Sequence, residues 1–269
     1  MPDSIKPASI PTTVPTATPL QPRKRAIVVG ASSGLGAALA RRLADEGYLV
    51  ALLARRAELL QVLCQEINQK HAETRAVCHR HDVSDYDSVP SLLPRIISDL
   101  GGLDVFIYMA GANFPPGLEH LNFEGDRQMM ETNVIGAIAW LVPVAELFKS
   151  MGGGHIIGIS SVAGDRGRVG NPGYNSSKAA LSTYLEALRN RLTRHGVHVL
   201  TVKPGFVKTE MLKAAQGATP FAIEPERAAA DIYSALDKRK QTIYTPGIWR
   251  WIMLLIQHIP SVIFRRMSF

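Results

Sequence analysis

The sequence predicts an α/β fold: a single, doubly wound, mostly parallel sheet with helices on both faces. Short apolar or β-branched runs alternate with longer stretches of helical spacing from residue 23 to residue 247. A glycine-rich turn directly follows the first apolar run, and small-residue turns follow two later runs. Such turns, placed between a buried strand and a helix, are typical of doubly wound sheets.

Composition sets the limits of the interpretation. The chain has 269 residues with 46% hydrophobic residues, enough for the core of one large domain. A net charge of +7 with no basic run that carries interleaved aromatics favours phosphorylated cofactors or an anionic membrane surface over nucleic acid. Two cysteines, Cys64 and Cys78, fit a reducing compartment, so we expect a cytoplasmic protein.

The two ends of the chain depart from this pattern. Residues 1–22 are rich in Pro and Thr and are predicted to be a disordered tail. No apolar run approaches the roughly 18 residues that a bilayer span needs. Residues 248–269 form an apolar and basic extension that we expect to be helical.

Residues 26–29 are the first predicted strand, and the turn after it opens a helix that ends near Gly47. Glycines let the backbone approach a pyrophosphate, whose charge the helix N-terminus favours. The turn therefore predicts a dinucleotide site. The expected contacts are Gly30, Ser32, Ser33, Gly34, Leu35 and Gly36.

The second strand, 49–54, is followed by Arg55 and Arg56. An acidic residue here would bind the ribose hydroxyls of NAD, whereas arginine suits a ribose phosphate. We therefore expect NADP(H), with Arg55 as the phosphate ligand and Ser32 assisting it. For Arg56, a solvent-exposed start of the next helix, 57–70, remains an alternative.

A third strand, 75–79, leads to Asp82 and Val83, which are assigned to the cofactor site. Asp82 either accepts a hydrogen bond from the adenine amino group or caps a helix that begins near Ser84. His79 and His81 share a strand face, but no further ligands stand near them, so we predict no metal site.

The fourth strand, 103–109, leads into Ala110 and Gly111, and both are expected at the cofactor. A long helix over about 126–150 contains Asn133. Asparagine is a poor choice inside a helix. Asn133 therefore has either a local polar role or a mechanistic one, such as holding a proton-relay water.

Ser161 lies at the end of an apolar run, 156–159, that is predicted to be a buried strand. Tyr174 and Lys178 lie one turn apart on one face of a predicted helix. A nearby ammonium would lower the pKa of the Tyr174 phenol from its ordinary value of about 10. Tyr174 would then exchange a proton with a reacting oxygen to which Ser161 is hydrogen-bonded. Tyr-x-x-x-Lys is common on exposed helices, so this spacing alone identifies no site.

The sixth strand, 197–202, is followed by Pro204 and Gly205, which predict a turn over a ligand. Residues 210–223 are either a mobile substrate lid or an ordinary surface loop. A helix, 225–238, and a strand, 241–245, complete the sheet. The extension 248–269 fits an interfacial membrane helix, a hydrophobic cover over the substrate site, or a dimer contact.

In this order the motifs closely resemble those of the short-chain dehydrogenase/reductase family, over nearly the whole chain from Arg25 to Gly247. They are Gly30-x3-Gly34-x-Gly36, Asp82, Ala110-Gly111, Asn133, Ser161, Tyr174-x3-Lys178 and Pro204-Gly205. One departure is that the usual Asn-Asn-Ala-Gly is Tyr108-Met109-Ala110-Gly111 here. This puts local geometry and cofactor affinity in question.

The resemblance implies a catalytic tetrad of Asn133, Ser161, Tyr174 and Lys178. Lys178 would also hold the nicotinamide ribose, and Asn133 would position a relay water. The backbone from Gly205 to Val207 and the hydroxyl of Thr209 would meet the nicotinamide end.

The residues and the resemblance together predict a Rossmann-type dinucleotide-binding catalytic domain over 23–247. We expect an NADP(H)-dependent oxidoreductase that moves a hydride between nicotinamide and a small-molecule carbonyl or alcohol. By resemblance the protein would be a homodimer or homotetramer. A non-catalytic NADP-binding sensor or scaffold is the alternative, and a lipophilic substrate and peripheral membrane contact through 248–269 are left open.

Overall fold

The computed structural model describes residues 24–116, 119–213 and 218–267, so the predicted tail, 1–22, lies outside the described residues. In the described residues, seven strands form one sheet in the order β3-β2-β1-β4-β5-β6-β7, and every neighbouring pair is parallel. The strands are β1 (Arg25–Val29), β2 (Leu49–Ala54), β3 (Ala76–Arg80), β4 (Val105–Tyr108), β5 (Gly154–Ile159), β6 (Val197–Pro204) and β7 (Thr242–Thr245). The predicted doubly wound α/β fold is confirmed.

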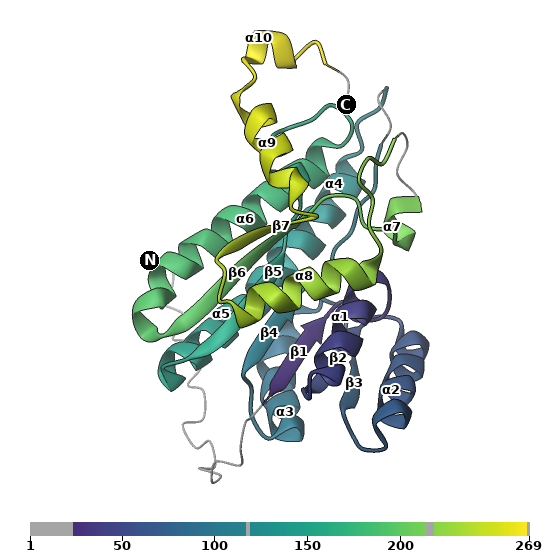
Figure 1. Ribbon diagram of the computed structural model, residues 1–269, viewed down its shortest axis with the longest axis vertical. Coiled ribbons are helices and arrows are strands. Elements are labelled where there is room, and N and C mark those ends of the chain that lie inside the picture. Colours follow the sequence, from purple (N-terminus) through teal and green to yellow (C-terminus); the bar gives the residue numbers. More distant parts are fainter. Residues whose placement is uncertain (1–23, 117–118, 214–217, 268–269) are drawn as a thin grey trace, which may run out of the picture.

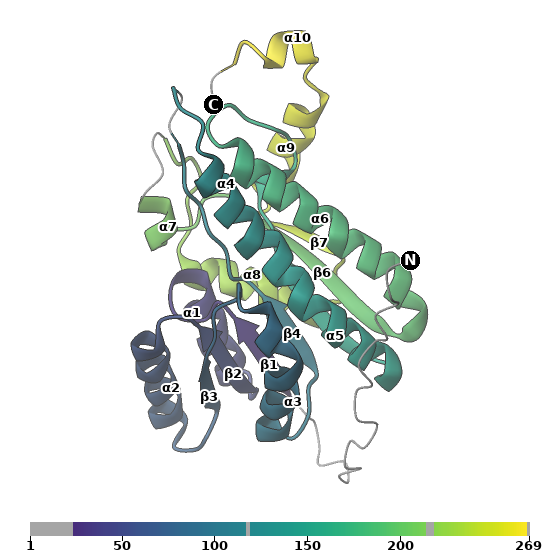
Figure 2. The ribbon, with the colours of Figure 1, turned by 180° about the vertical axis from the view of Figure 1, so that it is seen from behind.

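Helices cover both faces of the sheet (Figures 1 and 2). On one face lie α1 (Gly34–Asp45), α2 (Ala57–His71) and α8 (Pro225–Asp237); on the other lie α3 (Val89–Leu100), α5 (Gly136–Met151) and α6 (Pro172–Leu192). Side chains of β1 alternate between the two layers: Ala26 and Val28 pack in one core, Ile27 and Val29 in the other. Strands buried on both faces need continuous apolar runs, which is why these segments were recognisable in the sequence.

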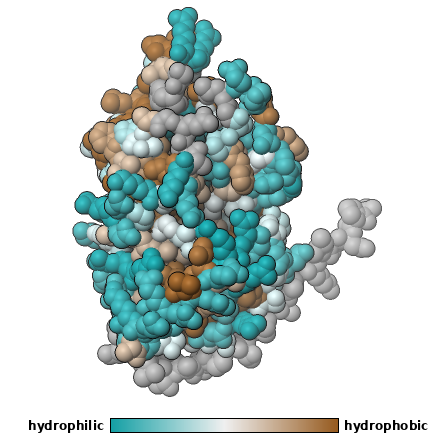
Figure 3. Space-filling view, turned by 90° about the vertical axis from the view of Figure 1, so that its right-hand side faces the viewer, coloured by the Kyte–Doolittle hydropathy of each residue, from teal (hydrophilic) through white to brown (hydrophobic). Residues whose placement is uncertain are grey.

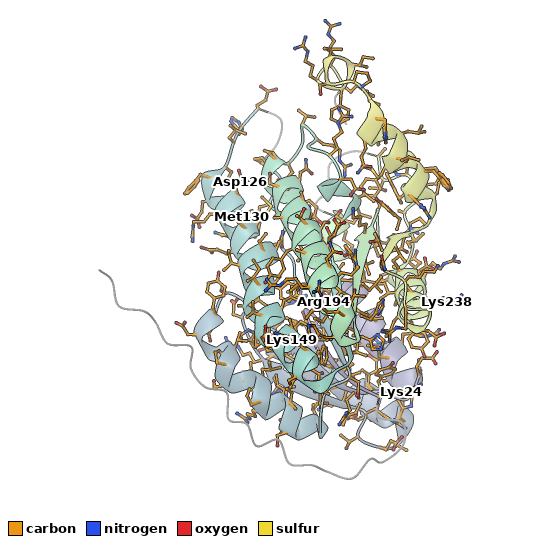
Figure 4. The ribbon with its side chains drawn as sticks, turned by 90° about the vertical axis from the view of Figure 1, so that its left-hand side faces the viewer. Lys24, Asp126, Met130, Lys149, Arg194 and Lys238 are labelled. Carbon is orange, nitrogen blue, oxygen red and sulfur yellow. The ribbon has the colours of Figure 1, made fainter. Side chains whose placement is uncertain are left out.

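The helix expected near 126–150 is part of one helical run, Phe123 to Met151. It consists of α4 (Phe123–Met130), a π-helical segment η2 (Glu131–Ile135) and α5. Figure 4 places Asp126 and Met130 on α4 and Lys149 towards the opposite end of the run. By length and composition alone this run could cross a membrane, which corrects the expectation that no segment could. Trp140, Leu141 and Phe148 of α5 are buried in the core against the sheet, as in a core helix of a globular domain.

The start of the helix expected near Ser84 was predicted too early. A turn comes first, then the short helix η1 (Tyr86–Ser88) and α3. The Asp82 carboxylate accepts from the backbone N–H of Ser84 at 3.0 Å and from its hydroxyl at 2.8 Å. Asp82 therefore closes this turn, and the suggestion that it caps a helix is wrong.

The C-terminal segment contains α9 (Ile248–His258) and α10 (Ser261–Phe264). Trp249 and Met253 of α9 pack against Val162, which lies in the short helix η3 (Val162–Gly164). Two further short helices are η4 (Thr193–His195) and α7 (Glu210–Lys213). In Figure 1 the C-terminal helices project beyond the carboxyl edge of the sheet.

Candidate active site

The carboxyl ends of the strands border a cleft of about 720 Å³. Its lining comes from the turns after β1, β2, β4, β5 and β6 and from the first turn of α6. Doubly wound sheets bind ligands at this edge. Every predicted site residue except Asp82 and Asn133 lines this cleft.

The turn after β1 requires its glycines. Gly30 has a φ of +95°, and a Cβ there would press on the backbone of Ala110. A Cβ on Gly36 would overlap the carbonyl oxygen of Gly30. The turn thus lies close against neighbouring backbone and leaves the N-terminus of α1 facing the cleft, where Ser33 is the N-cap residue and its side chain makes no capping bond. This arrangement fits a pyrophosphate.

The two arginines after β2 behave differently. Arg56 donates to the hydroxyl of Ser32 at 3.1 Å, to that of Ser33, and to the carboxylate of Glu210 at 3.1 Å. The side chain of Arg55 is 72% exposed and lies 3.9 Å from the Asp82 carboxylate. Arg56 is therefore hydrogen-bonded to the glycine turn. The sequence did not reveal this contact. The available signal was a second basic residue at the strand end.

Asp82 lies between His81 and Val83, two residues that line the cleft. Burial opposes its ionisation, but hydrogen bonds from Ser84 and the charge of Arg55 leave the pKa of Asp82 below its usual value. An ionised carboxylate at this position can accept a hydrogen bond from an amino group, so the adenine contact stays a prediction.

A strand end and a helix start present Ser161, Tyr174 and Lys178 to the cleft. Asn171 caps α6, because its side-chain oxygen accepts from the backbone N–H of Tyr174 at 3.0 Å. Tyr174 consequently sits in the first turn of α6 and Lys178 one turn further. The Lys178 ammonium donates to the carbonyl of Ile159 at 3.0 Å, which ties the helix to the end of β5.

Burial dominates the ionisation of this pair. It raises the pKa of the Tyr174 phenol above its ordinary value, whereas a hydrogen bond with Ser161 and the charge of Arg168 lower it. Burial also lowers the pKa of Lys178 to about 8. The phenol is therefore less acidic than the sequence argument expected, although the Lys178 ammonium lies 5.8 Å from the centre of the Tyr174 ring. The cation that favours the phenolate is Arg168, which also lines the cleft.

Asn133 lies behind the cleft in η2 and is fully buried. Its side-chain oxygen accepts from the backbone N–H of Ala112 at 2.7 Å, and its nitrogen donates to the Ala112 carbonyl at 3.0 Å and the Ser177 hydroxyl at 2.9 Å. A local polar role is thus present. A Cβ on Gly111 would lie 3.4 Å from both the Asn133 oxygen and the Lys178 ammonium, so these two atoms converge above Gly111.

Tyr108, at the departure from the family motif, is fully buried at the end of β4. Its hydroxyl donates to the carbonyl of Thr132 at 2.6 Å, and Thr132 belongs to η2 beside Asn133. π-Helical segments loosen the regular hydrogen-bond ladder and often occur at functional sites. Tyr108 therefore joins β4 to the segment that holds Asn133.

The turn after β6 is packed from behind. A Cβ on Gly205 would overlap the Trp249 indole, and a Cβ on Gly34 would lie 2.8 Å from a methyl carbon of Thr209. Val207 forms an isolated bridge with Ile223, so the end of the segment 210–223 is anchored to the turn after β6. Residues 214–217 of the suggested lid lie outside the described residues.

Sequence reasoning also missed Arg168, Asn171 and Asn113, which line the cleft. Asn171 donates to the side-chain oxygen of Asn113 at 2.7 Å. The run Asn171-Pro172 could have revealed the cap, since Asn is favoured at the N-cap and Pro at the first helical position. Arg168 lies in a glycine-rich loop without periodicity, which offered no signal.

The histidines of β3 and the turn after it serve packing. His81 accepts from the indole N–H of Trp140 at 3.1 Å, and His79 lies 3.4 Å from Asp99. Among the residues that the structure describes, no group of three or more His, Cys, Asp or Glu side chains is arranged to hold a metal ion.

Comparisons with known proteins agree with this geometry. Residues 24–219 match the family model described as short chain dehydrogenase. An uncharacterized oxidoreductase of Myxococcus xanthus is 37% identical over 205 residues, 76% of this chain and 80% of that protein. An uncharacterized oxidoreductase of Mycobacterium tuberculosis is 29% identical over 91% of this chain and 98% of its own length.

Solved structures give the same result. An actinorhodin polyketide ketoreductase, determined with NADPH, superimposes with a TM-score of 0.76 at 25% identity, covering 84% of this chain and 96% of its own. An alcohol dehydrogenase of Thermococcus sibiricus, complexed with 5-hydroxy-NADP, superimposes with a TM-score of 0.74 at 26% identity. The match covers 83% of this chain and 96% of that one. The chain therefore belongs to the short-chain dehydrogenase/reductase family of oxidoreductases.

Proposed function

We propose that the protein is an NADP(H)-dependent oxidoreductase that interconverts a carbonyl and an alcohol on a small molecule. The observation that carries this proposal is the convergence of Ser161, Tyr174 and Lys178 on one cleft with the glycine turn after β1. When bound, the nicotinamide supplies or accepts the hydride. Two structural neighbours determined with NADPH or an NADP derivative support the choice of coenzyme.

Proton transfer falls to the phenol. Tyr174 donates its proton to the carbonyl oxygen during reduction and takes it back during oxidation. Ser161, hydrogen-bonded to this phenol, stabilises charge that develops on the same oxygen. A phenol carries its proton at neutral pH, so Tyr174 is present in the form that donates to the carbonyl oxygen.

Lys178 and Asn133 support the transfer. One ammonium N–H of Lys178 is used by the Ile159 carbonyl. Its other donors have no hydrogen-bond partner among the described residues and would hold the nicotinamide ribose. Both N–H groups of Asn133 are occupied, so its contribution to a relay water would come from the oxygen that faces Lys178. Its bonds to Ala112 hold the backbone of the turn after β4.

The coenzyme phosphate would meet both arginines. Arg55 stays our predicted ligand of the ribose phosphate, and Arg56 joins it through its bonds to Ser32 and Ser33. A charge-assisted hydrogen bond contributes about 1.5 to 3 kcal/mol. Arg55→Ala should therefore weaken NADPH binding by about ten- to a hundredfold and leave NADH nearly unchanged. Titration of each single variant and of the pair separates the two side chains, and an unchanged coenzyme preference in all three would remove this assignment.

The decisive experiment is Tyr174→Phe. We expect the variant to bind NADPH normally, followed by nicotinamide fluorescence, and to lose turnover by about 100-fold or more, followed by absorbance with a panel of ketones, aldehydes and sterols. Near-normal turnover would refute the mechanism. If the unaltered protein binds NADPH but turns over none of the panel, the non-catalytic sensor or scaffold is favoured.

Further properties belong to the same proposal. Val169, Phe206, Met211 and Leu212 give the cleft apolar lining, which favours a lipophilic substrate. The free thiols of Cys64 and Cys78, with the pKa of Cys64 raised to about 11 by burial, suit a reducing compartment such as the cytoplasm. By family resemblance we expect a homodimer or homotetramer.

A further inference from the structure

The last two helices present an apolar surface to the outside. We define the C-terminal surface as the exposed apolar side chains Ile248, Trp251, Leu254, Leu255, Val262 and Ile263, together with the exposed Arg250, Arg265 and Arg266. Trp251 is 61% exposed and Leu255 is 71% exposed. Contiguous exposed apolar side chains of this size mark interaction sites.

Helix α9 has apolar side chains on two faces, and only one of these faces packs against the rest of the domain. Trp249 and Met253 are buried against Val162. Ile248, Trp251 and Leu255 follow each other at helical spacing on the outward side. In Figure 3 hydrophobic residues lie beside hydrophilic ones at the upper end of the molecule, where these helices project in Figure 1. The outward face is therefore not explained by packing against the described residues, and its residues are not among those that line the cleft.

The charge of this segment has one sign. Residues 248–269 contain Arg250, Arg265 and Arg266 and no Asp or Glu. A second copy of the chain, related by a two-fold axis, would place one positively charged surface against another. An anionic lipid surface instead complements them, and Trp and Arg beside Leu and Ile are the composition of helices that lie at a membrane interface.

The segment is held in a fixed orientation. Arg166 donates to the carbonyls of Ile256 and Gln257 at the end of α9, and its guanidinium lies 3.9 Å from the centre of the Phe264 ring. The neighbouring Asp165 is bonded to Lys203 and Tyr244 of β6 and β7. Asp165 and Arg166 belong to the loop that begins at Ser161, a residue of the cleft. The C-terminal surface therefore lies at the same end of the molecule as the cleft.

We propose that the C-terminal surface docks on an anionic lipid bilayer. The apolar side chains enter the boundary between headgroups and acyl chains, and the arginines contact the headgroup phosphates and carboxylates. Helix α9 then lies in the plane of the membrane and does not cross it, since eleven residues are too few to span a bilayer.

Co-sedimentation of the full chain with vesicles tests the proposal. We expect the protein to pellet with phosphatidylcholine vesicles that contain phosphatidylserine and to stay in solution with phosphatidylcholine alone. Arg265→Ala with Arg266→Ala should weaken binding by about fivefold for each arginine removed. Leu255→Ser should weaken it on the order of tenfold. The matched control is Val62→Ser, which changes a similarly exposed apolar side chain on α2 and should bind as the unaltered protein does.

Fluorescence gives a second readout. Of the three tryptophans in the chain, Trp140 and Trp249 are buried and Trp251 is exposed. Anionic vesicles should therefore shift the emission to the blue, and Trp251→Phe should abolish the shift. An unaltered thermal unfolding midpoint checks that each variant folds.

Three outcomes would overturn the proposal: no binding to anionic vesicles, equal binding by the Leu255 and Val62 variants, or an unshifted emission. A fourth is that the protein does not bind vesicles and that Leu255→Ser lowers its molecular mass in light scattering. This result would identify the surface as a contact between two copies of the chain. The vesicle assay uses neither coenzyme nor substrate, so its result is independent of the reaction proposed above.

Discussion

Replacing Tyr108 by phenylalanine removes a single hydroxyl from the place where the family motif carries asparagine. That hydroxyl donates to the Thr132 carbonyl at 2.6 Å. Tyr108 is fully buried beside the core of α5, and phenylalanine keeps its ring. The substitution therefore tests one hydrogen bond between β4 and η2.

The expected size of the effect follows from what the change leaves behind. The Thr132 carbonyl would lose its partner beside a ring that water does not reach, and an unsatisfied buried group costs about 1 to 3 kcal/mol. We expect the free energy of unfolding to fall by this amount. Because Asn133 follows Thr132 and holds the Ala112 backbone, turnover should fall by about tenfold, below the loss of about 100-fold that a misplacement of roughly 1 Å can cause.

Urea unfolding followed by circular dichroism measures the first effect, and steady-state kinetics the second. Tyr184→Phe is the control, because the Tyr184 hydroxyl has no hydrogen bond to any residue the structure describes. If Tyr108→Phe costs no more stability than Tyr184→Phe, the bond does not hold η2 in place. A stability loss with unchanged turnover would separate Tyr108 from Asn133 and refute the second step.

Two more predictions concern the cleft. Arg168→Gln removes the cation that lowers the pKa of Tyr174, so that pKa should rise further. The alcohol-oxidation rate needs the phenolate and should therefore begin to rise at a higher pH, and Arg168→Lys should restore the pH profile. An unchanged pH profile for Arg168→Gln would exclude the effect. Gly36→Ala should destabilise the protein by about 1 to 3 kcal/mol or more and abolish coenzyme binding, since its Cβ would overlap the Gly30 carbonyl. Gly153→Ala, which meets nothing within 4 Å, should be neutral in the same thermal melt; equal effects of the two would contradict the close packing of the turn.

Local rules explain why much of the fold was readable. Each buried strand needed a short apolar run, and each crossover needed a helix, so β1 and α1 followed from adjacent residues. The glycine turn was recognisable because its backbone conformation and close approaches exclude side chains. Boundaries such as the start of α3 were less accurate, because the hydrogen bonds of the Asp82 carboxylate with Ser84 close a turn before the helix.

Residues whose role depends on distant partners were not accessible in this way. The sequence order of Arg55 and Arg56 does not tell which guanidinium reaches Ser32 and Ser33, since that depends on the path of the chain after β2. The pKa of Tyr174 was also misjudged. Spacing placed Lys178 beside it, but spacing contains no information on how deeply the pair is buried.

The sequence by itself determined the doubly wound sheet, the glycine turn and the helix that carries Tyr174 and Lys178, because each depends on conformational preferences of neighbouring residues. Only the tertiary structure decided that Arg168 is the cation that favours the phenolate, that Tyr108 is bonded to η2, and that one side of α9 faces outward. Burial and long-range contacts set these features, and both arise only when segments far apart in the chain come together.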